Sequence, residues 1–168
     1  GSMFYKIDFA LLNFIAVHKP NWSILLIGNW WLKNEKDIEL FDELINKDNV
    51  HYLGEKPKEQ LPGYLSQTDV CLMPFKKIEF VKYMAPLKLL EYLAAGKPIV
   101  AIDREIKYDF SEFIKVASTK KDFVAAIGEA LEEERQNDKS LVEARKNIAR
   151  ENSWESRIDQ MMKIIELH

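Results

Sequence analysis

Four short apolar runs recur along the chain and constrain its fold more than any other feature. They are SILLIG at residues 23–28, VHYLG at 50–54, DVCLMP at 69–74 and PIVAID at 98–103. A short continuous apolar run is typical of a strand that is buried on both faces of a parallel sheet. Because longer segments with helical spacing separate the runs, the order of elements indicates βαβ units with right-handed crossovers.

The segments between and after these runs have the spacing of helices. Residues 7–18 repeat apolar side chains every three or four positions, and Asp8 stands where a helix N-cap is expected. We expect helices at residues 7–18, 34–46, 58–67, 87–95, 120–135, 139–151 and 154–167, and a last strand at 114–117. The predicted fold class is α/β: a Rossmann-like, three-layer α/β/α domain with a parallel sheet and a helical C-terminal end.

Length and composition fit one globular domain. The chain has 168 residues, 47% of them apolar and 30% charged, with a formal net charge of −3. It therefore has enough apolar residues for one core and lacks the basic excess of a nucleic-acid-binding arm. Residues 1–3 (GSM) are typical of a cleaved expression tag, which leaves 4–168 as the domain. The single cysteine, Cys71, lies in an apolar run, so we expect a buried thiol and a reducing compartment.

The connection at residues 74–86 is the strongest candidate for a functional loop. It follows a predicted strand and holds three lysines, a glutamate and aromatic residues. In open parallel sheets, ligands bind beyond the carboxyl ends of the strands, where such connections lead into the next helix. Pro86 suits the first turn of that helix, and the backbone N–H groups after it form a site for an anion.

Lys88 and Glu91 lie three residues apart at the start of this otherwise apolar helix. An ammonium is unfavourable in a first turn unless a negative group is bound nearby, and a phosphate would supply that charge. A carboxylate one turn further along the same face is suited to accept hydrogen bonds from sugar hydroxyls. The alternative is an ordinary lysine–glutamate pair on a solvated helix face. The largely apolar helix leaves little room for such a face, and the preferred order places glutamate before lysine, so a pocket explains the arrangement better.

Other kinds of site lack their signatures. The sequence contains no dinucleotide-binding or phosphate-loop glycine motif and no zinc-binding cysteine or histidine motif. His18, His51 and His168 do not have metal-ligand spacing, so we expect no metal site. His51 begins a strand whose end faces the proposed pocket.

Taken in order, these segments resemble the C-terminal, donor-binding half of a GT-B-fold retaining glycosyltransferase. The resemblance is to the large group 1, or family-four, type, and it rests on three stretches: KPNWSILLIG, NVHYLGEKPKEQLPGYLSQTDVCLMPF and PLKLLEYLAAGKPIVA. The last stretch is similar to a teichuronic-acid or capsular-polysaccharide subgroup. NSWESR near Trp154 resembles the start of the family's closing helix.

The resemblance implies binding of a nucleotide-diphosphate sugar, UDP- or GDP-linked, without a metal or another cofactor. Glu91 matches the glutamate that holds the ribose hydroxyls. Ala85, Pro86 and Leu87 match the backbone that receives the diphosphate, and Lys88 would lie beside the phosphates. Loops near Gly28, His51 and Gly54 would complete the donor site and select the base.

Two departures from the family pattern limit what the resemblance implies. Where many members carry a second glutamate, this chain has Tyr83, so the catalytic residue stays open, with Glu79 and Tyr83 as the candidates. The chain also has room for one of the two domains of such enzymes. We therefore expect a fragment that lacks the N-terminal acceptor domain and is inactive alone.

The function expected from the sequence is donor binding in a glycosyltransferase that serves cell-surface polysaccharide synthesis with a glycan or lipid-linked acceptor. The alternative is a non-catalytic Rossmann-like interaction module with a decayed nucleotide site. A sugar-nucleotide epimerase is a weaker alternative, because no histidine and carboxylate set supports proton abstraction. The expected location is the cytoplasm, and peripheral association of the full-length enzyme with the inner membrane face stays open.

Overall fold

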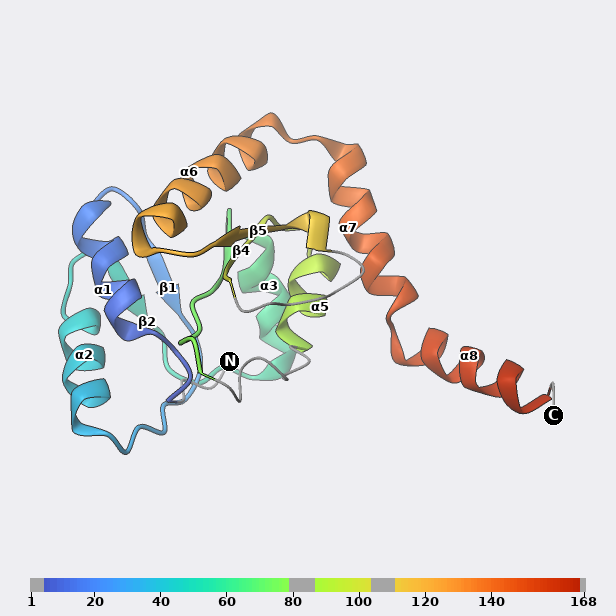
Figure 1. The fold of residues 1–168 in the computed structure, drawn as a ribbon, viewed down its shortest axis with the longest axis horizontal. Helices are drawn as coiled ribbons and strands as arrows, with labels where there is room; N and C mark the ends of the chain where they lie inside the picture. Colours follow the sequence, from blue (N-terminus) through green and yellow to red (C-terminus); the bar gives the residue numbers. More distant parts are fainter. Residues whose placement is uncertain (1–4, 79–86, 104–110, 167–168) are drawn as a thin grey trace.

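The computed structural model describes the backbone of residues 5–78, 87–103 and 111–166. Helices and strands alternate along most of this length, and the last three elements are helices (Figure 1). In chain order the elements are α1 (Phe9–His18), β1 (Ile24–Leu26), α2 (Glu35–Ile45), β2 (Val50–Tyr52), η1 (Lys58–Gln60), α3 (Leu61–Ser66), β3 (Cys71–Met73), α5 (Leu87–Ala94), β4 (Ile99–Ile102), η2 (Ser111–Phe113), β5 (Ile114–Ala117), α6 (Lys120–Gln136), α7 (Lys139–Glu151) and α8 (Trp154–Glu166).

The expected helix at residues 58–67 differs in its first turn. That turn is the 3₁₀ helix η1, and the α-helical part, α3, begins at Leu61. Pro62 follows at once and has no N–H, so it cannot donate the α-helical hydrogen bond back to the Lys58 carbonyl. The N-cap predicted at Asp8 is confirmed, because its carboxylate accepts the Leu11 N–H at 2.8 Å at the start of α1.

The strands form two parallel sheets within the described residues. β1 pairs with β2, and β3, β4 and β5 pair in that order. The register places Ile24 opposite Val50 in the first sheet and Cys71 opposite Ile99 in the second. The sequence pattern predicts parallel pairing correctly, but it carries no sign of the division into two sheets.

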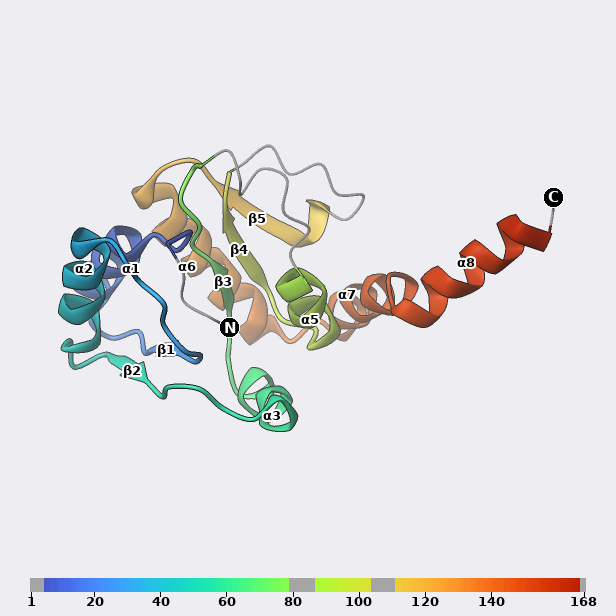
Figure 2. The same cartoon turned by 90° about the horizontal axis from the view of Figure 1, so that it is seen from below.

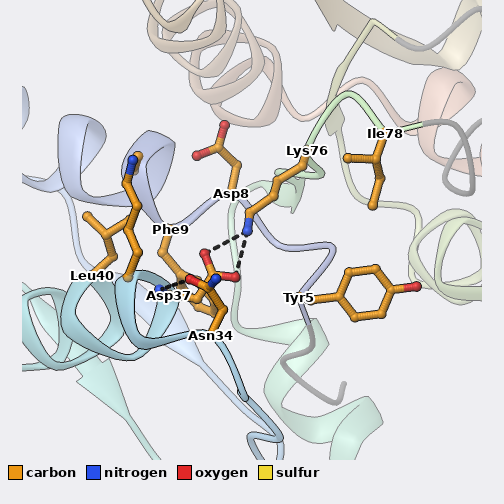
Figure 3. A pocket seen from close by; sticks show the side chains of 10 residues that line it. Tyr5, Asp8, Phe9, Asn34, Asp37, Leu40, Lys76 and Ile78 are labelled. Carbon is orange, nitrogen blue, oxygen red and sulfur yellow. Dashed lines mark hydrogen bonds and ion pairs between the residues drawn. The ribbon is translucent and has the colours of Figure 1, made fainter.

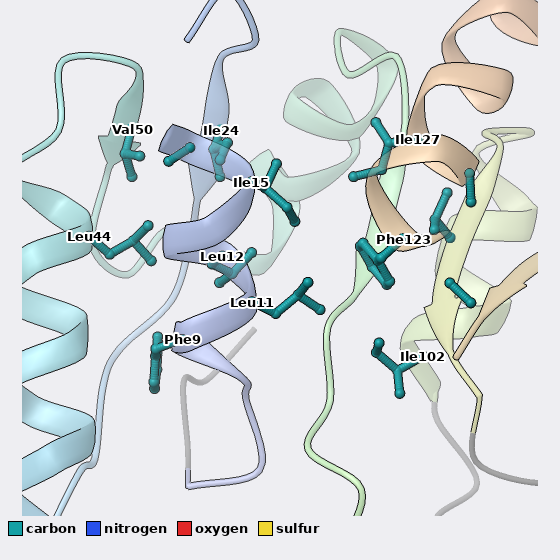
Figure 4. Packing of buried hydrophobic residues seen from close by; sticks show 14 of the residues in the cluster. Phe9, Leu11, Leu12, Ile15, Ile24, Leu44, Val50, Ile102, Phe123 and Ile127 are labelled. Atoms are coloured by element: carbon teal, nitrogen blue, oxygen red, sulfur yellow. The ribbon is translucent and has the colours of Figure 1, made fainter. Parts of the chain in front are cut away.

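Two apolar cores lie on opposite faces of the three-stranded sheet. Val100 and Ile102 of β4 join the larger core, which α1, α2 and α6 cover (Figure 4). Ile99 and Ala101, the alternate residues of the same strand, join the smaller core with α5. Helices thus lie on both faces of the sheet (Figure 1), and the predicted three-layer α/β/α fold is confirmed.

The C-terminal helix α8 extends away from the rest of the molecule (Figures 1 and 2). It follows α7 directly along the chain, and its exposed side chains include Trp154, Ile158, Met161 and Ile165. These four lie at spacings that place them on one side of the helix. None of the helices in the described residues is both long and apolar enough to cross a membrane.

We predict that Val100→Ala destabilises the chain by about 1–3 kcal/mol, because it leaves a cavity in a strand that is buried on both faces. Val116→Ala in the neighbouring strand is the matched control. The Val100 residue is 0% exposed and the Val116 residue 53% exposed, so we expect a change within about 0.5 kcal/mol for the control. Urea unfolding of both variants measures the difference. Equal losses would show that β4 is not the buried strand described here.

A second prediction concerns the thiol of Cys71, which is buried as the sequence indicates. Burial raises the pKa of this thiol from its ordinary value of 9.0 to about 11. The thiolate is the reactive form, so at pH 8 the folded chain should hold about a hundredfold less of it than the unfolded chain. We expect iodoacetamide to alkylate Cys71 far more slowly in buffer than in urea. Similar rates in the two conditions would contradict this burial.

Candidate functional site

The carboxyl ends of β1 and β2 meet at two of the predicted site residues, Gly28 and Gly54. The Gly28 N–H donates to the Gly54 carbonyl at 2.8 Å, and the Tyr52 hydroxyl donates to the Gly28 carbonyl at 3.1 Å. The two glycines have φ angles of 138° and 67°, values that side chains with a Cβ rarely adopt. The sequence-predicted loops therefore lie side by side, and their backbone path depends on glycine.

His51 lies in the middle of β2, opposite Leu25 of β1. Its neighbours Val50 and Tyr52 contact the larger core. Because successive side chains of a strand point to opposite faces, His51 lies on the other face of the sheet. The residue is exposed there. Its expected role in a donor site stays a prediction.

Helix α5 brings Lys88 and Glu91 together, as their spacing predicts. The ammonium Nζ of Lys88 lies 2.6 Å from Oε2 of Glu91, and the side chains are 35% and 44% exposed. Leu89 and Leu93 on the opposite side of the helix are buried. The structure thus confirms that the two side chains share one face. It also shows that this face is solvent-accessible and that the two charges pair with each other, as in the alternative interpretation.

Several predicted residues cannot be placed in the site. Ala85 and Pro86 at the expected helix start lie outside the described residues, as do both catalytic candidates, Glu79 and Tyr83. Leu87, the first described residue of α5, is exposed. The described part of the predicted site therefore consists of Leu87, the charged pair, His51 and the two glycines.

The end of α5 is held tightly against α7. Gly96 follows the helix with a φ of 73°, and a Cβ at this position would lie 2.7 Å from Cγ1 of Val142. The buried Arg145 side chain donates to the Gly96 carbonyl at 3.2 Å and also pairs with Glu133. These contacts fix the position of the helix that carries Lys88 and Glu91.

A cavity of about 490 Å³ lies near the residues that follow β1 and β3 (Figure 3). At its centre the Lys76 ammonium donates to both carboxylate oxygens of Asp37, at 2.6 and 2.7 Å. Lys76 follows β3, and the largely buried Asp37 lies in the first turn of α2. The cavity is lined by Tyr5, Asp8, Phe9, Ala10, Asn34, Lys36, Asp37, Leu40, Lys76 and Ile78.

The sequence pattern does not predict this cavity. Its one signal was the lysine-rich connection after β3, which includes Lys76. The partner, Asp37, has the pattern of an ordinary acidic residue in a first helical turn. Only the fold brings these two charges, 39 positions apart in the sequence, into contact.

The buried titratable groups near α5 do not favour acid–base or nucleophilic chemistry. Burial raises the pKa of the Tyr92 phenol, as it does that of the Cys71 thiol, so both stay protonated at neutral pH. Within the described residues, no group of three or more histidine, cysteine, aspartate or glutamate side chains is arranged to hold a metal ion. The site therefore offers groups that can bind a ligand. These groups are backbone amides, an ammonium and a carboxylate.

Comparison with solved structures supports the fold. The chain superimposes on a Staphylococcus aureus TarM structure with a TM-score of 0.64 and 15% identity, covering 96% of this chain and 34% of that one. It superimposes on the pneumococcal O-GlcNAc transferase GtfA, solved with UDP and GlcNAc, with a TM-score of 0.60 and 14% identity. That match covers 98% of this chain and 35% of GtfA.

Sequence comparison gives the family. A Bacillus subtilis (strain 168) protein, named as the teichuronic acid biosynthesis glycosyltransferase TuaH, is 30% identical over 171 residues. The match covers 97% of this chain, which thus spans 41% of the length of that relative. The family model described as glycosyl transferases group 1 matches residues 1–133. The chain therefore belongs to the group 1 glycosyl transferases.

Proposed function

We propose that this chain is the donor-binding part of a glycosyltransferase that moves a sugar from a nucleotide diphosphate to a glycan or lipid-linked acceptor. The family match and the named activity of the Bacillus relative support glycosyl transfer, and the name of that relative favours a role in cell-surface polysaccharide synthesis. Because the chain spans 41% of that relative, the acceptor-binding part of the enzyme is proposed to lie in the remaining length.

The observation that carries the proposal is the exposed charged face of α5. This helix follows the connection from β3, the place where parallel sheets bind their ligands. Lys88 Nζ donates to Oε2 of Glu91, which leaves Oε1 of that carboxylate and two N–H donors of the ammonium for a ligand. The pair therefore does not need to separate before it binds.

In the proposed complex the Lys88 ammonium lies beside the diphosphate, and the Glu91 carboxylate accepts hydrogen bonds from the ribose hydroxyls. The positive charge would stabilise the leaving diphosphate as negative charge develops on it, and the proposal therefore needs no metal. Gly28, His51 and Gly54 would lie near the base, while Ala85, Pro86 and Leu87 would supply backbone N–H groups. Uridine and guanosine diphosphates remain the two donor classes.

Transfer requires the acceptor to be held against the donor sugar, and such positioning supplies a large share of the rate. We therefore expect the isolated chain to bind the donor weakly and to transfer no sugar. A cytoplasmic location, with peripheral contact of the whole enzyme to the membrane, belongs to the same proposal.

The rival is a non-catalytic interaction module. The 2.6 Å contact between Lys88 and Glu91 favours it, because an ordinary surface ion pair has the same geometry. The two functions differ in what they bind. Only the first requires a nucleoside diphosphate to reach α5.

We predict that UDP or GDP added to the labelled chain shifts the amide resonances of Lys88 and Glu91, and that Glu91→Gln weakens this binding by about tenfold or more. A hydrogen bond to a charged acceptor contributes about 1.5–3 kcal/mol, and the amide lacks that charge. Glu129→Gln is the matched control, because Glu129 is an exposed residue of α6. A folded spectrum with no shift at millimolar nucleotide would favour the interaction module.

A further prediction separates the phosphate role from the ribose role. Lys88→Met should reduce the affinity for UDP and leave the weaker affinity for uridine nearly unchanged, because uridine has no phosphate to contact the ammonium. Glu91→Gln should weaken the binding of both UDP and uridine. Calorimetric or NMR titration of the two ligands against the two variants measures this pattern. Equal losses of uridine and UDP affinity in Lys88→Met would contradict the assigned role.

A further inference from the structure

The cavity beside Lys76 lies where the course of the chain changes from one sheet to the other. The chain runs from β1 to β2 in the first sheet and from β3 through β4 to β5 in the second. The cavity lies between the residues that follow β1, at the start of α2, and the residues that follow β3. Open α/β sheets bind their ligands beyond the carboxyl ends of their strands.

The charges around the cavity do not favour an anion. The N-terminus of α1 is capped by the Asp8 carboxylate, and the first turn of α2 contains Asp37. The positive ends of both helices are therefore already met by carboxylates of the chain. The Lys76 ammonium is neutralised by Asp37, and across the lining two aspartates balance two lysines. An added phosphate would meet carboxylates as well as ammonium groups.

Hydrogen-bonding capacity remains at three lining residues. An ammonium has three donors, and Lys76 uses two of them on Asp37. Asn34 accepts the Asp37 N–H through Oδ1, which leaves its side-chain NH₂ group. Asp8 accepts the Leu11 N–H through Oδ1, which leaves Oδ2. Donors and an acceptor thus occur together, the combination that a hydroxyl group satisfies because it both donates and accepts.

Apolar surfaces stand on either side of these polar groups. Figure 3 shows the Tyr5 ring and Ile78 on one side of Lys76 and Leu40 on the other, with the buried Phe9 ring behind Leu40's side of the cavity. Tyr5 is 52% exposed, so part of its surface is open to a ligand. Aromatic faces carry partial negative charge and attract the C–H groups of a sugar ring. The volume of about 490 Å³ lies within the range of small-molecule sites.

We propose that this cavity binds a neutral sugar unit without the help of a nucleotide. The hydroxyl groups face Lys76, Asn34 and Asp8, and the apolar face of the ring lies against Tyr5. The further assignment, that this unit is a portion of the acceptor glycan extending beyond the acceptor-binding part of the enzyme, rests on the proposed function, whereas binding of the sugar itself does not. The cavity and the charged face of α5 would then hold two different ligands.

The test is a titration of the labelled full chain with maltose as a neutral sugar, and with inorganic phosphate and UDP in separate arms. We expect maltose to shift amide resonances at residues 34–37 and 76–78, with a dissociation constant in the millimolar range. UDP should instead shift the amide resonances of Lys88 and Glu91. Failure of the UDP arm alone would count against the proposed function and leave the sugar site intact.

Asn34→Ser should weaken maltose binding at least fivefold, because serine keeps the helix cap and removes the amide donors. Tyr5→Ala provides a second variant that leaves both helix caps and the ion pair in place, and it should weaken maltose binding to a similar extent. Glu39→Gln, an exposed change on the same helix α2, should leave binding unchanged. Thermal unfolding checks that each variant is folded.

Three outcomes would overturn the proposal. The first is that maltose at tens of millimolar causes no shifts at residues 34–37 and 76–78. The second is that phosphate causes shifts there and maltose does not, and the third is that neither Asn34→Ser nor Tyr5→Ala weakens maltose binding.

Discussion

The fold depends on the burial of β4 on both of its faces. All four of its residues are buried, and they alternate between the larger core under α6 and the smaller core under α5. A strand in this position must be apolar at every residue, since neither face meets water. β4 therefore fixes where the helices on both faces lie. It also fixes where the connections at the carboxyl edge emerge, because β3 and β5 both pair with it.

Ion pairs and hydrogen bonds of charged side chains then stabilise the positions of the helices around this strand. Arg145 of α7 is buried and contacts both Glu133 of α6 and the carbonyl of Gly96, so one side chain joins three parts of the chain. Lys97, the next residue, pairs with Glu134 at 2.7 Å. These contacts lie at the end of α5 that is remote from the connection after β3. The helix is thus anchored at one end, and its charged pair lies near the other end at the surface.

Most of the fold could be predicted from the sequence because its signals are local. The four apolar runs contain β1 to β4, and Gly28, Gly54 and Gly96 have the positive φ angles expected where strands and helices end. The shared face of Lys88 and Glu91 follows from helical spacing alone. Their direct pairing also follows from that spacing, although the sequence left open whether the pair serves a ligand.

The rest depended on contacts between distant residues. Asp37 and Lys76 are 39 positions apart, and each fits a common local pattern, an acidic first helical turn and a lysine-rich loop. The two proposed ligands would approach the carboxyl edge from opposite faces of the sheet, because α5 covers one core and α1 with α2 covers the other. Packed layers lie about 10 Å apart, whereas reacting atoms must come within about 3.5 Å. A sugar in the cavity could therefore meet the donor only by reaching across the strand ends, and an extended glycan chain would have that reach.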